Sequence, residues 1–131
     1  MDLKKIGNFG EKIACFYLEK KGYKVLERNY IKKLAPPGKG EIDIIAQKGD
    51  IISFVEVKTI QQDFSRPKKR QNFLPEDKVD FRKQRKLKNL AQIWLSENKK
   101  FLDSKWQIDV IAVRVDLNIK KAKINHFQNA V

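Results

Sequence analysis

The sequence has one cysteine, Cys15, and one histidine, His126, among its 131 residues. A single cysteine forms neither an intramolecular disulfide nor a cysteine zinc cluster, and a single histidine excludes mechanisms that need two. Nothing around His126 resembles a Ser-His-Asp set. We interpret Cys15 as a partly buried helix residue and His126 as a structural or surface residue.

Long apolar runs are also missing, and none approaches the ~20 residues of a membrane-spanning helix. Residues 1–5 are followed by an amphipathic pattern and not by the apolar run of a signal peptide. The chain has no Gly-x-x-x-x-Gly-Lys-Ser/Thr loop, so we expect no nucleotide cofactor. These absences predict a cytoplasmic protein without a membrane partner.

Acidic residues are outnumbered, since 29 lysines and arginines against 16 aspartates and glutamates give a net charge of +13. This excess favours a polyanionic partner, with nucleic acid first and an anionic membrane second. A merely basic protein would have the same composition, and charge says nothing about catalysis.

The length and the 41% of hydrophobic residues predict a single domain over residues 1–131. Apolar spacing and turn residues predict an alternation of helices and strands, which indicates an α/β fold with a sheet flanked by helices. The predicted helices are 7–21 and 79–98, and the predicted strands are 23–31, 41–47, 51–58, 107–115 and 122–127.

Each predicted helix has an apolar stripe that should face the sheet. In the second helix the stripe consists of Leu87, Leu90, Ala91, Trp94 and Leu95. In the first helix we expect an N-cap at Asn8, an end at Gly22, and a stripe of Phe9, Ile13, Phe16 and Tyr17.

Gly49-Asp50 separates two strands rich in β-branched residues and predicts a two-residue hairpin. Counting back from this turn, Lys48 faces Ile51, Ile45 faces Phe54 and Ile44 faces Val55. The same register places Ile42 opposite Val57, Asp43 opposite Glu56, and Glu41 opposite Lys58.

Opposed side chains on one sheet face have Cβ atoms about 5 Å apart, so Asp43 and Glu56 would repel each other without a cation between them. Mg²⁺ is often held by one or two carboxylates, which makes this pair a candidate metal site. Glu-x-Lys alone is weak evidence, because it also begins at Glu19, Glu76 and Glu97. Only Glu56 lies in a strongly apolar strand with an acid across the hairpin.

Two further charged residues have two interpretations each, and a third has one. Glu11 either completes a capping box with Asn8 or points from the helix toward the acidic pair. Lys83 either presents its ammonium at the edge of that pair or is a plain surface lysine. Asp109, which opens an apolar strand, is interpreted by default as a structural acid at the strand end.

Residues 59–78 form a long polar connection, and we predict a flexible basic loop at 60–78. Between Gln61 and Lys88 there are ten basic and four acidic residues, a local charge of +6. Phe64 and Phe73 either belong to a flap that closes on a nucleic-acid backbone, which we favour, or anchor the loop to the core. The basic residues expected to hold the backbone are Arg66, Lys68, Lys69 and Arg70.

Over nearly its whole length the chain resembles the YraN-like family, which is similar to archaeal Holliday junction resolvases of the PD-(D/E)xK nuclease superfamily. The matching residues stand in the family's order. They are Gly10-Glu11, Ala14, Gly22-Tyr23, Arg28-Asn29-Tyr30, 40–46, 54–58, Lys83, 109–111 and Asn129-Ala130.

The resemblance implies a restriction-endonuclease-like mixed sheet flanked by helices, and a role for each site residue. Asp43 and Glu56 match the metal-binding acids, and Glu11 matches a helix glutamate that completes the site directly or through water. Lys58 matches the lysine that orients the attacking water. The backbone carbonyl of Val57 would be a further metal ligand.

The leading hypothesis is therefore a Mg²⁺- or Mn²⁺-dependent endonuclease that hydrolyses phosphodiester bonds in DNA, including branched or otherwise structured DNA. The alternative is a non-catalytic nucleic-acid-binding module on a nuclease-like fold, with Lys83 among the binding residues in either case. An RNA substrate stays open. Similar resolvases work as dimers, so a homodimer is a state to test.

Overall fold

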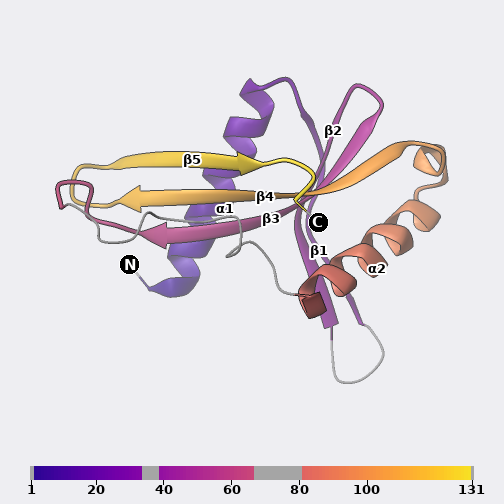
Figure 1. Cartoon of the computed structure of the whole chain (residues 1–131), viewed down its shortest axis with the longest axis horizontal. Coiled ribbons are helices and arrows are strands. Elements are labelled where there is room, and N and C mark those ends of the chain that lie inside the picture. The colour runs from indigo at the N-terminus through magenta and orange to yellow at the C-terminus, as the bar shows by residue number, and fades with distance from the viewer. Residues whose placement is uncertain (1, 34–38, 67–80, 131) are drawn as a thin grey trace.

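A computed structural model describes residues 2–33, 39–66 and 81–130 of the chain (Figure 1). These residues form two α-helices, a five-stranded sheet and one short 3-10 helix, the α/β class that the sequence predicts. The elements in chain order are α1 (Leu3–Lys20), β1 (Lys24–Lys33), β2 (Lys39–Lys48), β3 (Ile51–Gln61), α2 (Phe81–Glu97), η2 (Lys99–Phe101), β4 (Lys105–Asp116) and β5 (Lys121–Phe127).

The sheet is mixed and has the strand order β1-β2-β3-β4-β5. Neighbouring strands are antiparallel except for β3 and β4, which are parallel and are joined by the connection that contains α2. One apolar cluster packs α2 residues such as Leu90 and Trp94 against Phe54, and another packs α1 residues such as Ala14 and Leu18 against Val55. The sheet therefore lies between two helices, as expected of a restriction-endonuclease-like fold.

Strands β2 and β3 separate partway along their length. Their pairing runs from Lys48 and Ile51 to Ile44 and Val55, as the hairpin register predicts. Beyond that point β2 pairs with β1 as far as Lys39, while β3 pairs with β4 as far as Gln61. We call this divergence the fork, and Figure 1 shows β1 and β2 turning away there from β3, β4 and β5.

The fork corrects the outer part of the predicted register. No backbone pair joins Ile42 to Val57, Asp43 to Glu56 or Glu41 to Lys58, because the strands have already diverged. Antiparallel counting assumes that a ladder continues, whereas here β3 pairs with β4 from Ile51 to Gln61 and loses β2 as its second neighbour beyond Val55.

Helix α1 begins earlier than predicted. Its N-cap is Asp2, whose Oδ1 accepts a hydrogen bond from the Lys5 backbone N–H at 2.8 Å, so Asn8 lies inside the helix and forms no capping box with Glu11. The predicted end is confirmed. Gly22 has a left-handed φ of 93°, and the next backbone N–H, of Tyr23, bonds back to Leu18 O at 2.9 Å.

The predicted stripe on α1 is wrong in part. The buried positions are Ile6, Gly10, Ala14, Cys15 and Leu18, whereas Phe9 and Phe16 are 40% and 62% exposed. Small residues allow the helix to lie close to the sheet. Close packing therefore buries the face that carries them, and the larger apolar side chains stay exposed. On α2, by contrast, the predicted stripe is confirmed, since Leu87, Leu90, Ala91, Trp94 and Leu95 are all buried.

The lone histidine and cysteine are structural. His126 is buried with its Nε2 2.8 Å from Asp109 Oδ2 and its Nδ1 3.2 Å from the Tyr17 hydroxyl. Asp109 also accepts hydrogen bonds from Gln107 Nε2 and the Asn129 backbone N–H, which confirms it as a structural acid. Burial raises the pKa of the Cys15 thiol, which leaves it less reactive. No described helix has the length and apolarity needed to cross a membrane.

Gly10 brings α1 against β3 beside Thr59. A Cβ added at Gly10 would lie 1.9 Å from Thr59 Oγ1 and 2.8 Å from Thr59 Cβ, and a β-branched side chain cannot swing fully away. Gly7, also in α1, has nothing within 4 Å of an added Cβ. The two glycines thus form a matched pair for substitution.

We predict that Gly10→Ala lowers the free energy of unfolding by about 1–3 kcal/mol, because the close contact must open. Gly7→Ala should raise it by roughly 0.5–1 kcal/mol, because alanine favours a helix. Urea denaturation followed by circular dichroism measures both values. The close-packing account fails if Gly10→Ala is as stable as Gly7→Ala, or if Thr59→Ala recovers none of the loss in the double variant.

Candidate active site at the fork

Asp43 lies on β2 immediately beyond the last backbone pair between β2 and β3. Its Oδ2 accepts a hydrogen bond of 2.8 Å from the backbone N–H of Val57 on β3. The carboxylate thus replaces the partner that β2 would have offered if the ladder had continued. It ties the two strands together where their backbones separate.

The pKa of Asp43 is raised from 3.8 to about 7. Burial is the largest cause, followed by the negative charge of Glu56, and the hydrogen bond from Val57 only partly offsets them. Glu11 and Glu41 raise the pKa further. Several carboxylates are therefore concentrated at the fork, and their charges disfavour ionisation of Asp43.

Glu56 is buried on β3, and its Oε1 lies 2.5 Å from the Lys83 ammonium of α2. Burial by itself would lower the pKa of Lys83, but the hydrogen bond and charge of Glu56 outweigh it and the pKa is raised. Lys83 is therefore a cation held at the acidic pair, the first of its two interpretations from sequence.

Glu11 reaches the edge of this group from α1. With its amide nitrogen turned toward the acids, Asn29 donates hydrogen bonds to Glu11 Oε1 at 2.9 Å and to Glu41 Oε1 at 3.2 Å. Arg28 Nη2 lies 4.0 Å from Glu11 Oε1. Burial and then Glu41 raise the pKa of Glu11, with a smaller contribution from Glu56. Glu11 therefore influences the acidic pair through charge.

A cavity of about 390 Å³ opens beside the acidic pair. Basic side chains from β2 and the first turns of α2 surround it, so an anion would meet positive charge before it met the acids. The charged residues that line it are Lys39, Glu41, Asp43, Glu56, Arg82, Lys83 and Lys86.

Lys58, the third residue of the motif, lies half-buried two positions beyond Glu56 on the same strand. Alternate residues of a strand point to one face, so Lys58 and Glu56 share a face of β3. The Lys58 and Lys83 side chains are within hydrogen-bonding reach of each other, which places both nitrogen atoms beside Glu56.

The described residues contain no group of three or more aspartate, glutamate, histidine or cysteine side chains that could hold a metal ion. They therefore do not form a closed protein cage for a cation. Asp43 and Glu56 nevertheless fit Mg²⁺ or Mn²⁺, because Mg²⁺ keeps several waters and is usually bound through one or two carboxylates. Burial and the charge of Glu56 raise the pKa of Asp43, and Glu56 binds the Lys83 ammonium, so both acids lie where added positive charge would be favourable.

The predicted backbone-binding residues lie mostly outside the described part of the chain, which does not include Lys68, Lys69 or Arg70. Arg66 is 82% exposed, and its Nε is 3.3 Å from Asp63 Oδ2 in the turn after β3. In the same turn the Phe64 backbone N–H bonds to Asp116 Oδ2, and Lys123 lies over the Phe64 ring. The start of the connection is thus anchored, which favours the second interpretation for Phe64.

Sequence reasoning did not single out three residues of the site. Glu41 could have been found, because it precedes Asp43 by two residues on one strand and so shares its face. Arg82 could have been found from its position next to Lys83. Asn29 stands among the residues that match the family, but local pattern does not predict its left-handed φ of 53° inside β1.

We predict that Asp43→Asn makes the metal-free protein more stable above about pH 7 and changes little below about pH 4. The folded-state pKa of Asp43 is raised, so its stability contribution is present at low pH and is lost as pH rises from 3.8 through about 7. Above that range the asparagine avoids burying a charge, a gain of roughly 2–4 kcal/mol. Denaturation in chelator across this pH range measures it, and a pH-independent difference would contradict the assigned cause.

Comparison with known proteins assigns the chain to a family. The model of the uncharacterised protein family UPF0102 matches residues 10–113. A UPF0102 protein of Caldanaerobacter subterraneus subsp. tengcongensis is 42% identical, over 97% of this chain and 94% of that protein. A UPF0102 protein of Alkaliphilus oremlandii is 39% identical over 97% of each, and one of Caldicellulosiruptor bescii is 35% identical over 99% of each. The chain therefore belongs to family UPF0102.

Proposed function

We propose that the chain is a Mg²⁺- or Mn²⁺-dependent endonuclease that hydrolyses phosphodiester bonds in DNA, including branched or otherwise structured DNA. One observation carries the proposal: Asp43 and Glu56 come together at the fork, with Lys58 on the same strand face as Glu56. This is the residue arrangement of the PD-(D/E)xK nucleases that the sequence resembles.

Each residue of the site would have its own role in binding or hydrolysis. A divalent cation bound by Asp43 and Glu56 would polarise the scissile phosphate and lower the pKa of an attacking water. Lys58 orients that water and offsets negative charge that develops on the phosphoryl oxygens. Glu11 completes the acidic group, and the Val57 carbonyl is a further candidate ligand.

Substrate binding would rely on the basic rim of the cavity. Lys39, Arg82 and Lys86 lie around the acids and would contact phosphates without reading sequence. The net charge of +13 adds long-range attraction to any polyanion. DNA is favoured over RNA only by the resemblance, since phosphate contacts are common to both.

A second function is favoured by the contact between Lys83 and Glu56. Because Lys83 already supplies a positive charge to Glu56, the pair could be a structural one in a nucleic-acid-binding module that needs no metal. Both functions involve nucleic acid, but only the nuclease requires a divalent cation. Metal binding therefore separates them.

We predict metal-dependent cleavage of DNA by the purified protein. Junction, flap and linear DNA should be tested with and without Mg²⁺ or Mn²⁺. Glu56→Ala and Lys58→Ala should each slow cleavage by about 100-fold or more, the usual loss when a charge-stabilising group is removed. Lys105→Ala is the control, because Lys105 is exposed and pairs with Ile51 at the far end of β3 from the fork. Cleavage that survives both substitutions would exclude the proposed site.

We also predict saturable Mn²⁺ binding by calorimetry, and its loss in Asp43→Asn and Glu56→Gln. Lys83→Met should strengthen this binding, because it removes the ammonium that competes for Glu56. The binding module predicts no Mn²⁺ heat even when DNA is present, and DNA binding that weakens with salt but ignores a chelator.

A further inference from the structure

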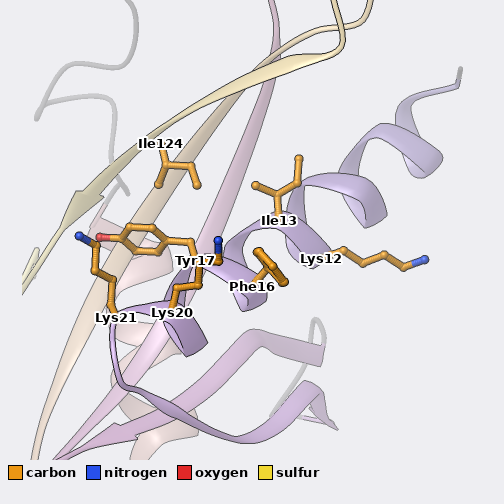
Figure 2. A pocket seen from close by; sticks show the side chains of 7 residues that line it. All are labelled: Lys12, Ile13, Phe16, Tyr17, Lys20, Lys21 and Ile124. Carbon is orange, nitrogen blue, oxygen red and sulfur yellow. The ribbon is translucent and has the colours of Figure 1, made fainter.

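The outer surface of α1 has an apolar hollow that no described element covers. Its floor and walls are Ile13, Phe16 and Tyr17 of α1 and Ile124 of β5 (Figure 2). The hollow is broadly open to solvent, and its volume of about 620 Å³ exceeds that of the cavity at the fork. Phe16 is 62% exposed, which is unusual for an aromatic residue in a helix that packs on a core.

Three lysines border this hollow and no acidic residue lines it in the described structure. Lys20 Nζ lies 4.9 Å from the Phe16 ring centroid, and Lys21 Nζ lies 5.9 Å from that of Tyr17. Figure 2 shows Lys12 extending at one end of the hollow and Lys21 at the other, next to the Tyr17 hydroxyl. An apolar centre is thus flanked by positive charge.

The hollow has a rigid base. The Tyr17 hydroxyl contacts His126 Nδ1 at 3.2 Å, and His126 Nε2 contacts the buried Asp109 at 2.8 Å. Tyr17 also packs edge-on against the His126 ring. A wall fixed in this way loses little conformational entropy when a ligand binds.

We propose that this hollow is the docking site for an acidic segment of a partner protein that carries aromatic or aliphatic side chains. The apolar side chains would fill the space between Ile13 and Ile124, and the flanking carboxylates would meet Lys12, Lys20 and Lys21. Charge complementarity selects the acidic residues of the partner, and the apolar walls require its hydrophobic residues.

Other occupants fit the surface less well. A second copy related by a two-fold axis would place the same lysines opposite one another, and like charges repel. Nucleic acid would use the lysines and could stack a base on the exposed Phe16 ring, but it would leave the aliphatic walls of Ile13 and Ile124 uncovered. A bilayer needs several apolar side chains that protrude, whereas Phe16 is the one exposed apolar residue among the described residues of this lining and Ile13, Tyr17 and Ile124 are half-buried.

The hollow lies on the outer side of α1, whereas the acidic cavity is lined by residues of β2, β3 and α2. A partner could therefore dock while nucleic acid occupies the fork. The inference rests on the surface of α1 and β5 alone and is independent of the proposed function.

The test is a selection of random dodecapeptides displayed on phage against the full chain, with counter-selection on Phe16→Asp. Phe16 is exposed, so this variant should keep the fold, which circular dichroism checks. We expect enriched peptides that combine acidic with aromatic or aliphatic residues. Enriched peptides that lack acids, or that bind Phe16→Asp equally well, would overturn the proposal.

The strongest selected peptide is then synthesised with a fluorophore and titrated by anisotropy. Phe16→Asp and Lys20→Glu should each weaken its binding roughly tenfold or more, as expected for central contacts. Leu102→Asp is the matched control, because Leu102 is a similarly exposed apolar residue (52%) beyond α2, and its substitution should have no effect. Equal losses in all three variants would contradict a local site.

Three parallel measurements with Phe16→Asp address the other occupants. They are binding to vesicles that contain anionic lipid, binding to a short single-stranded DNA, and the oligomeric state by ultracentrifugation. We expect none of them to change. A loss of vesicle or DNA binding, or the conversion of a dimer to a monomer, would assign the hollow to that occupant and overturn the peptide proposal.

Discussion

The site depends on the hydrogen bond between the Asp43 carboxylate and the backbone N–H of Val57. Strand β3 pairs with β4 along its whole length but loses β2 as a neighbour beyond Val55, and this separation would leave the half-buried backbone N–H of Val57 without a partner. Asp43, just beyond the last backbone pair between β2 and β3, accepts a hydrogen bond from that donor with its side chain. The same residue thereby becomes a buried acid next to Glu56. One hydrogen bond therefore joins the separating strands and also positions an acid of the candidate site.

The electrostatics of the fork follow from this arrangement. Two carboxylates on separating strands lie near each other without a backbone pair between them, which leaves room for a third group. The Lys83 ammonium of α2 binds Glu56, but the pKa of Asp43 is still raised, so the ionised form of Asp43 remains unfavourable. A hydrated divalent cation would relieve both acids, and this is the physical basis of the proposed nuclease site.

The sequence predicted those features that depend on local pattern. Turn residues and β-branched strands gave the register from Lys48 to Val55, and helical spacing gave the buried face of α2. It failed where tertiary contacts decided the outcome. Hydrophobicity alone ranks Phe16 above Gly10 as a core residue, yet the close contact with Thr59 requires the glycine inside. The left-handed backbone at Asn29 likewise depends on the folded chain, and the contact of Lys83 with Glu56 decided between two interpretations that the sequence left open.

The central claim is that the fork binds a divalent cation through Asp43 and Glu56. The most direct measurement is a crystal structure with Mn²⁺ and a short DNA duplex, in which anomalous scattering locates the Mn²⁺ ion. The account predicts an anomalous peak about 2 Å from carboxylate oxygens of both residues, with Lys83 moved away from Glu56. A structure with no peak at the fork, and with Lys83 still bound to Glu56, would contradict it.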